Sequence, residues 1–169
     1  MLLPKQIHLS LLKNKDDIHR VVAMEAASYP TNEAASEASI RFRQKNAGSF
    51  FYVAYKCSTD KTVIGFINGT LTSKDTLDHD SMSHHDAQGS LLCIHSVVVD
   101  QIFRRQGIAT EMLKQYVKSI ATSFPQIKRI MLISKAHLVT FYEKCGFSIT
   151  RTSPIVHGQD PWLELELIL

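Results

Sequence analysis

The stretch that decides the fold is Val97-Val98-Val99-Asp100-Gln101-Ile102-Phe103-Arg104-Arg105-Gln106-Gly107-Ile108-Ala109-Thr110. An apolar, β-branched run passes into a short basic loop, which ends in Gly-x-Ala at the start of an amphipathic helix. At such a junction the unpaired backbone N–H groups and the helix dipole point at one place, with Arg104 and Arg105 beside it. The stretch predicts a strand, a glycine turn and a helix that bind a phosphate-bearing ligand. A strand-turn-helix junction that binds nothing is the alternative.

The composition is that of an ordinary soluble protein and gives little indication of particular partners. The chain has 169 residues, of which 44% are hydrophobic and 21% charged, so we expect one domain over residues 1–169. A net charge of +3 without a Lys/Arg-rich block gives no reason to expect a nucleic-acid partner. Residues 1–5 run into polar sequence without the apolar core of a signal peptide, and no run is long enough to span a membrane.

Three cysteines, odd in number and without metal-ligand spacing, favour a reducing compartment. We therefore expect a cytoplasmic protein that has no membrane partner. Monomer is the default expectation for the oligomeric state.

Hydrophobic periodicity predicts the element order β-α-α-β-β-β-α-β-α-β-β, a mixed sheet with helices on both faces. Strands are expected at Ile7–Leu12, Phe50–Lys56, Val63–Leu71, Leu91–Val99, Lys128–Ile133, Phe147–Thr150 and Trp162–Leu169. Helices are expected after Asn14 or Asp16, after Ser36, from Gly107 to about Ser123 and from His137 to Cys145, with Gly146 as the C-terminal cap of the last.

Two further expectations concern the surface of the molecule. Residues 73–89, rich in Ser, Asp and His, predict an exposed, mobile loop. In the last strand Leu163, Leu165 and Leu167 alternate with Glu164 and Glu166, so one face of that strand should be wet.

Two motifs resemble the GNAT superfamily of acetyl-CoA-dependent N-acetyltransferases. Arg104-Arg105-Gln106-Gly107-Ile108-Ala109 matches its Arg/Gln-x-x-Gly-x-Gly/Ala pattern, and Phe141-Tyr142-Glu143-Lys144-Cys145-Gly146-Phe147 matches its late helix–strand signature. Residues 94–99, 103–107, 138–147 and 29–36 extend the resemblance to the arylalkylamine (serotonin-type) and fungal polyamine N-acetyltransferases. The resemblance implies an α/β (α+β) GNAT fold, a mixed, mostly antiparallel twisted sheet of about seven strands with helices on both faces.

The resemblance also implies a co-substrate, acetyl-CoA, and no metal. The N–H groups of residues 105–110 would hold the pyrophosphate, where Gly107 lets the backbone come close without a Cβ. The backbone of residues 97–99 would bind the pantetheine arm as an added strand. The expected binding set is Val97, Val98, Val99, Arg104, Arg105, Gln106, Gly107, Ile108, Ala109 and Thr110.

Two residues are expected to move protons. A neutral His95 imidazole would help deprotonate the incoming amine, and the Tyr142 phenol would protonate the departing CoA thiolate. A core histidine and a packing aromatic are the alternatives. Strand alternation puts Cys93, His95 and Val97 on one face. Cys93 stands where the animal arylalkylamine enzymes carry a second histidine, and we expect it to be a packing residue.

The acceptor is expected to be a small-molecule primary amine, an arylalkylamine or a polyamine. Tyr29, Pro30 and Glu33 are the candidate substrate residues, although Glu33 is equally explained as a helix N-terminal carboxylate. His79, His84 and His85, with nearby aspartates, fit no closed zinc site. Two other functions stay open: acetylation of protein or peptide amines, N-terminal or lysine, and a non-catalytic acetyl-CoA-binding module.

Overall fold

The computed structural model describes residues 6–169. Residues 1–5, on which the expectation about a signal peptide rests, lie outside the described residues. The strands are β1 (His8–Leu11), β2 (Tyr52–Tyr55), β3 (Val63–Thr72), β4 (Leu91–Val99), β5 (Arg129–Ser134), β6 (Ser148–Thr152) and β7 (Leu163–Ile168). The helices are α1 (Asp17–Ser28), α2 (Glu37–Asn46), α3 (Ile108–Ser123) and α4 (Val139–Lys144). Short 3₁₀ turns lie at Gly48–Phe50, His79–Met82, Gln101–Phe103 and Ala136–Leu138.

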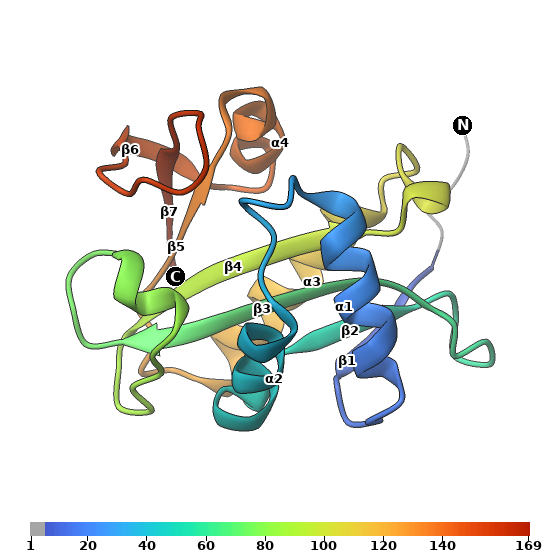
Figure 1. Ribbon diagram of the computed structural model, residues 1–169. Helices are drawn as coiled ribbons and strands as arrows, with labels where there is room; N and C mark the ends of the chain where they lie inside the picture. Colours follow the sequence, from blue (N-terminus) through green and yellow to red (C-terminus); the bar gives the residue numbers. More distant parts are fainter. Residues whose placement is uncertain (1–5) are drawn as a thin grey trace.

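The predicted fold class and element order are confirmed. The seven strands form one sheet in the order β1-β2-β3-β4-β5-β7-β6. Figure 1 shows α1 and α2 on one face of the sheet and α3 behind it. Each face has its own apolar core: Ile18 and Val21 of α1 pack on Phe66, whereas Met112 and Leu113 of α3 pack on the other side.

The predicted ends of the helices hold at two places and differ at a third. The Ser36 hydroxyl accepts a hydrogen bond from the Ser39 N–H at 3.1 Å and so caps α2. The Gly146 N–H donates to the Glu143 carbonyl at 3.0 Å just beyond α4. At α1, Asp16 makes no side-chain cap bond, whereas the Asn14 Oδ1 accepts a hydrogen bond from the Asp16 N–H at 3.0 Å.

The sheet opens between its two middle strands. β4 and β5 are parallel and pair only where Leu91–Cys93 meets Arg129–Met131. Beyond Cys93 the two strands part, and Figure 1 shows β5 and β7 rising away from β4 toward α4. The second half of β4 is therefore left without a strand on that side, which creates room for a ligand.

A β-bulge lies at His95, in this second half of β4. In the antiparallel pairing of β3 with β4, Gly69 faces Ile94 and Asn68 faces Ser96, so that His95 has no opposite residue. A Cβ on Gly69 would lie 2.6 Å from the Cys93 carbonyl oxygen, so only glycine permits this close approach of the two strands.

The bulge overturns the predicted alternation along β4. Cys93 and Val97 do not share a face: Cys93 packs with Leu77 and Met131, whereas Val97 packs against the core on the α3 side. The extra residue shifts the period by one, because strand side chains alternate with a period of two. Such bulges re-aim a side chain, here that of His95.

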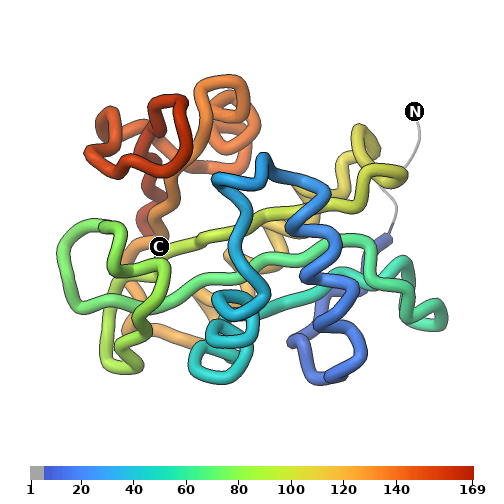
Figure 2. Tube along the Cα trace, in the orientation of Figure 1, coloured from blue at the N-terminus to red at the C-terminus, as the bar shows by residue number. Residues whose placement is uncertain are grey.

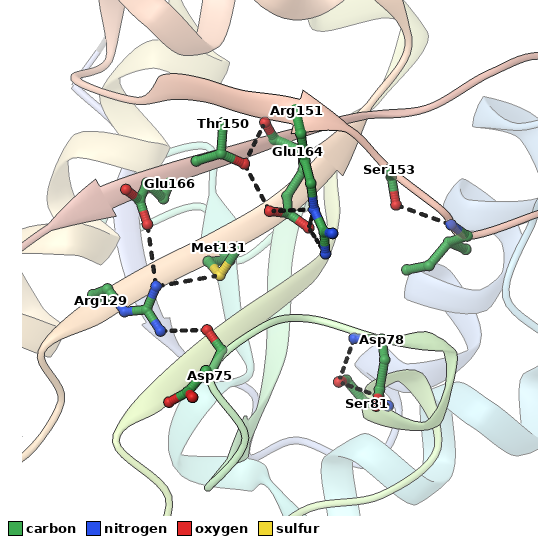
Figure 3. Close-up of polar contacts among 11 residues, drawn as sticks. Asp75, Asp78, Ser81, Arg129, Met131, Thr150, Arg151, Ser153, Glu164 and Glu166 are labelled. Atoms are coloured by element: carbon green, nitrogen blue, oxygen red, sulfur yellow. Dashed lines mark hydrogen bonds and ion pairs between the residues drawn. The ribbon is translucent and has the colours of Figure 1, made fainter.

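The last strand also departs from its predicted pattern. Glu164 is only 2% exposed, although its face was expected to be wet. A bulge in β6 brings both Thr150 and Arg151 to it, and Figure 3 shows their side chains converging on the Glu164 carboxylate. Glu166, farther along the same face, pairs with Arg129 of β5 at 3.2 Å. The charges are therefore paired between strands rather than left to water.

The expectation that residues 73–89 form an exposed loop is wrong for its centre. Leu77 and Ser81 are 1% and 3% exposed. The Asp78 side chain caps the 3₁₀ turn through the Ser81 N–H, as Figure 3 shows, and His85 Nδ1 accepts a hydrogen bond from the Leu71 N–H at 3.0 Å. These contacts hold the segment against β3.

Candidate active site

A cavity of about 590 Å³ lies where β4 and β5 part. Its walls come from the end of α1 and the loop after it, from residues 94–97 of β4, from the end of β5, and from α4 and the β6–β7 loop. Six residues predicted from the sequence line this one cavity: His95, Tyr142, Tyr29, Pro30, Glu33 and Val97. The fold thus brings the two proposed proton carriers and the three proposed substrate residues together.

His95 is held in one tautomer by the strand beside it. The Thr70 hydroxyl donates its single proton to the Ser81 carbonyl at 2.5 Å and lies 2.8 Å from His95 Nε2. We therefore assign the His95 proton to Nε2, which donates to the Thr70 oxygen. Nδ1 keeps its lone pair and has no hydrogen-bond partner among residues 6–169. A free imidazole nitrogen in the cavity is what a proton acceptor requires.

The electrostatic surroundings keep His95 neutral. Burial lowers the pKa of the imidazole well below its usual range, and the nearby Arg43 guanidinium lowers it further. Arg43 comes from α2 and is 4% exposed. Its guanidinium donates to the Asn68 side chain and to the Met82 carbonyl, each at 3.3 Å.

Tyr142 is a neutral phenol in an apolar setting. It is 8% exposed and packs edge-on against Phe141 and Phe147. Burial raises the pKa of Tyr142 above its usual range. Its hydroxyl makes no hydrogen bond to any of the described residues, so the proton is available to a bound molecule.

Tyr29, one of the candidate substrate residues, lines the cavity with its aromatic ring. Burial raises the pKa of Tyr29 above its usual range. Its hydroxyl lies 3.5 Å from the Val97 carbonyl oxygen, where it donates.

A buried polar group around Glu25 is absent from the sequence prediction. The Glu25 carboxylate is 2% exposed; its Oε1 accepts from the Ala35 N–H at 3.0 Å and from the Ser96 hydroxyl at 3.3 Å, while Oε2 has no partner. Burial raises the pKa of Glu25, and Arg43 opposes this shift. The signal was a carboxylate on the apolar stripe of α1, a position that usually holds a hydrophobic side chain.

The loop before α3 presents a row of free backbone donors. Among the described residues, the backbone N–H groups from Gly107 to Thr110, at the start of α3, have no hydrogen-bond partner. Gly107 has φ +77°, and a Cβ there would meet nothing within 4 Å. The left-handed turn aims successive N–H groups at open space beside the helix N-terminus, an arrangement that suits a phosphate.

Arg104, predicted to contact the cofactor, is instead engaged within the protein. Its Nε donates to the Val99 carbonyl and its Nη2 to the Ser28 hydroxyl, both at 3.1 Å. The side chain therefore ties the end of β4 to α1 and fixes the shape of the loop. Arg105 is exposed and has φ 60°.

At the far end of the cavity, three loops are joined by one lysine. Lys135 Nζ lies 2.5 Å from Glu33 Oε1 and 2.9 Å from Asp160 Oδ2, and 5.0 Å above the centre of the Trp162 ring. The ion pairs raise the pKa of Lys135. Glu33 is thus bound by a lysine and does not sit free as a helix N-terminal carboxylate. Figure 2 shows the loop after α1 beside the β6–β7 loop that carries Asp160.

Cys93 does not reach the cavity. It is fully buried, and desolvation raises the pKa of its thiol to about 12. This placement agrees with the prediction of a packing residue.

Of the three histidines in residues 73–89, His84 and His85 hold the segment in place, whereas His79 lines the cavity. His84 Nδ1 lies 3.1 Å from the Asp80 carbonyl oxygen, and His85 is bound to β3. Within residues 6–169 no three His, Cys, Asp or Glu side chains come together as a metal site. In the same part of the chain, none of the helices has the length and apolarity of a membrane span.

The chain belongs to the acetyltransferase (GNAT) family, whose family model matches residues 18–147. It is 30% identical over 107 residues to serotonin N-acetyltransferase from Mesocricetus auratus, covering 63% of this chain and 51% of that protein. The Homo sapiens serotonin N-acetyltransferase is 29% identical over 107 residues, with the same coverage of both chains. The chain thus spans about half the length of the curated relatives that it matches.

Solved structures share the fold over nearly the whole chain. The loading GNATL domain of CurA from Lyngbya majuscula superposes with a TM-score of 0.82 at 12% identity, covering 96% of this chain and 98% of that one. Arabidopsis thaliana Naa50 in complex with the bisubstrate analogue CoA-Ac-MVNAL has a TM-score of 0.70 at 17% identity, covering 95% and 97%. A GNAT-like decarboxylase, GphF in complex with isobutyryl-CoA, has a TM-score of 0.79 at 14% identity, covering 96% and 98%. Because one of these folds belongs to a decarboxylase, the function must be argued from the site.

Proposed function

We propose that this chain transfers the acetyl group of acetyl-CoA to a small primary amine, an arylalkylamine or a polyamine. The observation that carries the proposal is a single cavity in which a neutral His95 with a free Nδ1 and a protonated Tyr142 with a free hydroxyl stand together. A proton acceptor and a proton donor in one apolar site are the two groups that acyl transfer to an amine requires.

The loop before α3 fits the phosphates of coenzyme A. Four consecutive backbone N–H groups, those of residues 107–110, are unpaired among the described residues at this helix N-terminus. Together with the N–H groups of residues 105 and 106 they would hold the pyrophosphate. From there the unpaired edge of β4 leads back to the cavity, so that residues 97–99 would guide the pantetheine arm. When bound, acetyl-CoA supplies the activated acetyl thioester.

The two residues in the cavity have complementary tasks. His95 Nδ1 accepts the proton that the substrate ammonium must lose before its nitrogen becomes a nucleophile. The Tyr142 hydroxyl donates a proton to the departing sulfur. Both tasks need the protonation states that burial already imposes on these side chains at neutral pH.

A small amine fits the far end of the cavity better than a peptide. Lys135 joins the loop after α1 to the β6–β7 loop through Glu33 and Asp160, which closes that end. Tyr29 and Trp162 line the cavity with aromatic surface. The relatives named serotonin N-acetyltransferase support an arylalkylamine acceptor.

The test is a thiol-release assay with acetyl-CoA and a panel of tryptamine, phenylethylamine, spermidine, spermine, free lysine and peptides. Turnover of at least one small amine, with formation of the N-acetyl product confirmed by mass spectrometry, is the expected result. Turnover of peptides alone would replace the proposal with a protein or peptide acetyltransferase. Calorimetric binding of acetyl-CoA without turnover of any amine would identify a binding module instead.

A further inference from the structure

We infer that Lys135 occupies a built-in ammonium site in the acceptor cavity, and that it thereby selects monoamines over diamines and polyamines. The inference rests on the proposed function and chooses between its two acceptor classes, favouring arylalkylamines over polyamines. Its basis is the cage around the Lys135 ammonium, formed by the Glu33 and Asp160 carboxylates and the Trp162 indole, all of which line the cavity.

The cage has the chemistry that recognises a primary ammonium. Two carboxylate oxygens lie 2.5 and 2.9 Å from Lys135 Nζ, and the indole face lies 5.0 Å away on another side. Carboxylates and an aromatic face are the groups that bind alkylammonium ions in proteins. The same cage without the lysine would therefore bind the ammonium of a substrate.

The cage is held in place independently of the lysine. His157 Nε2 donates to the Glu33 carbonyl at 2.7 Å, and the Trp162 Nε1–H donates to the His157 carbonyl at 2.5 Å. Glu33 and Trp162 are thus connected through His157 as well as through Lys135. Removal of the lysine side chain should leave the carboxylate and the indole facing one another.

The position of the cage determines what it excludes. His95, Tyr142, Glu33 and Trp162 line the same cavity. A substrate whose nitrogen reaches His95 and Tyr142 therefore has the loops that carry Glu33 and Trp162 within the space that its tail fills. A neutral alkyl or aromatic tail packs there against the Lys135 stem and the apolar wall. A second ammonium would find the Glu33 and Asp160 carboxylates already paired with Lys135, so it would lose water in the cavity without gaining an ion pair.

The experiment compares amines that differ only in a second amino group. Each α,ω-diamine of three to eight carbons is paired with the n-alkylamine of equal length, and kcat/KM is measured at pH 8 with saturating acetyl-CoA. After correction for its two reactive ends, each diamine should have a kcat/KM at least ~10-fold below that of its monoamine in the wild type. A diamine that equals or exceeds its monoamine would overturn the inference without any variant.

The Lys135→Met variant supplies the second arm. The diamine-to-monoamine ratio should rise at least ~10-fold for the best-fitting length, through a lower KM for the diamine. Lys135→Arg keeps the charge and should keep the wild-type diamine-to-monoamine ratio. Lys135→Met combined with Glu33→Gln should not show the rise in this ratio that Lys135→Met shows alone. Lys144→Met, an exposed lysine outside the cavity, is the matched control and should leave the ratio unchanged.

The outcomes separate the two proposals. If Lys135→Met slows both amines of a pair equally, the lysine only joins the loops and the selectivity inference is overturned alone. A wild-type chain that acetylates no member of the series, no arylalkylamine and no polyamine overturns the proposed function and this inference with it.

Discussion

The two ends of the candidate active site treat their polar groups in opposite ways. At the loop before α3, the backbone N–H groups of residues 107–110 have no hydrogen-bond partner among the described residues, and the space beside Gly107 is open. We define the acceptor end as the buried group around Glu25 and Arg43 together with the cage around Lys135. Most charged side chains there form hydrogen bonds or ion pairs with other groups of the protein. One end is left unfilled for a ligand of fixed charge, whereas the other has been filled by side chains that limit what can enter.

Exposure explains why both arrangements are stable. Residues 104–107 are exposed, so water reaches the adjoining unpaired N–H groups at the start of α3 and satisfies them at little cost. Glu25 and Arg43 are almost completely buried, where an unpaired charge would be very unfavourable. Stability should therefore depend strongly on the acceptor end, and ligand affinity on the loop.

The largest expected effect follows from Arg43→Met. The substitution leaves Glu25 without a nearby cation. It also removes the guanidinium that donates hydrogen bonds to the Asn68 side-chain oxygen and to the Met82 carbonyl. We expect the free energy of unfolding to fall by about 3 kcal/mol, measured by urea denaturation. Arg41→Met, on the exposed side of the same helix, should leave the unfolding midpoint almost unchanged. A loss of less than about 1 kcal/mol in Arg43→Met would contradict the contrast between the two ends.

The next effect concerns chemistry rather than stability. Tyr142→Phe removes the proton donor while keeping the ring that packs on Phe141 and Phe147. We expect kcat to fall about 100-fold, with the dissociation constant of acetyl-CoA changed less than about threefold. Tyr52→Phe, on β2 and away from the cavity, is the matched control and should keep kcat within about twofold. Equal rates for wild type and Tyr142→Phe would remove Tyr142 from the proposed proton transfer.

A glycine pair tests the loop end of the comparison. A Cβ at Gly107 or at Gly48 would meet nothing within 4 Å, but only Gly107 has a positive φ, of +77°. Gly107→Ala should therefore strain the turn by about 1–2 kcal/mol and weaken acetyl-CoA binding about tenfold, as measured by calorimetry. Gly48→Ala should leave binding unchanged. Equal affinities in both variants would mean that the left-handed turn does not orient the phosphate-binding N–H groups.

The same contrast explains how much the sequence could predict. The loop before α3 is contiguous, and its function lies in backbone groups, so Gly107 and the residues around it could be recognised from one stretch. The element order followed from periodicity for a similar reason, because each helix or strand carries its own pattern.

The acceptor end could not be predicted in this way. Glu25, Arg43 and Asn68 come from three elements, and Lys135, Glu33 and Asp160 from three loops, so only the folded sheet brings them together. Likewise, the bulge that turns His95 toward Thr70 comes from an irregular pairing of β3 with β4. Arg104 was assigned to the ligand because of its charge, and only the coordinates show its bonds to Val99 and Ser28.

The smallest expected effect is a titration that does not occur. Burial and Arg43 lower the pKa of His95 well below 6.5, so its ring should stay neutral from pH 8 to below pH 6.5, with the proton on Nε2. Nitrogen NMR of the imidazole rings measures both the protonation state of His95 and the nitrogen that carries its proton. The His95→Gln variant identifies the His95 signal. In the urea-unfolded chain the same signal should show an ordinary pKa of about 6.5. A His95 that titrates near 6.5 in the folded chain would mean that water reaches the acceptor end as freely as it reaches the loop.

The lowered pKa of His95 also predicts the direction in which the free energy of unfolding changes with pH. Below about pH 6.5 His95 binds a proton in the unfolded chain but stays unprotonated in the folded chain, so acid favours unfolding. The free energy of unfolding should therefore fall by up to about 1.4 kcal/mol per pH unit more steeply in the wild type than in His95→Gln. Parallel slopes would show that the folded His95 is protonated as easily as the unfolded one. In that case the imidazole would become charged in mild acid. Nδ1 would then carry a proton below the pKa that NMR measures, and it could no longer accept the proton of the amine.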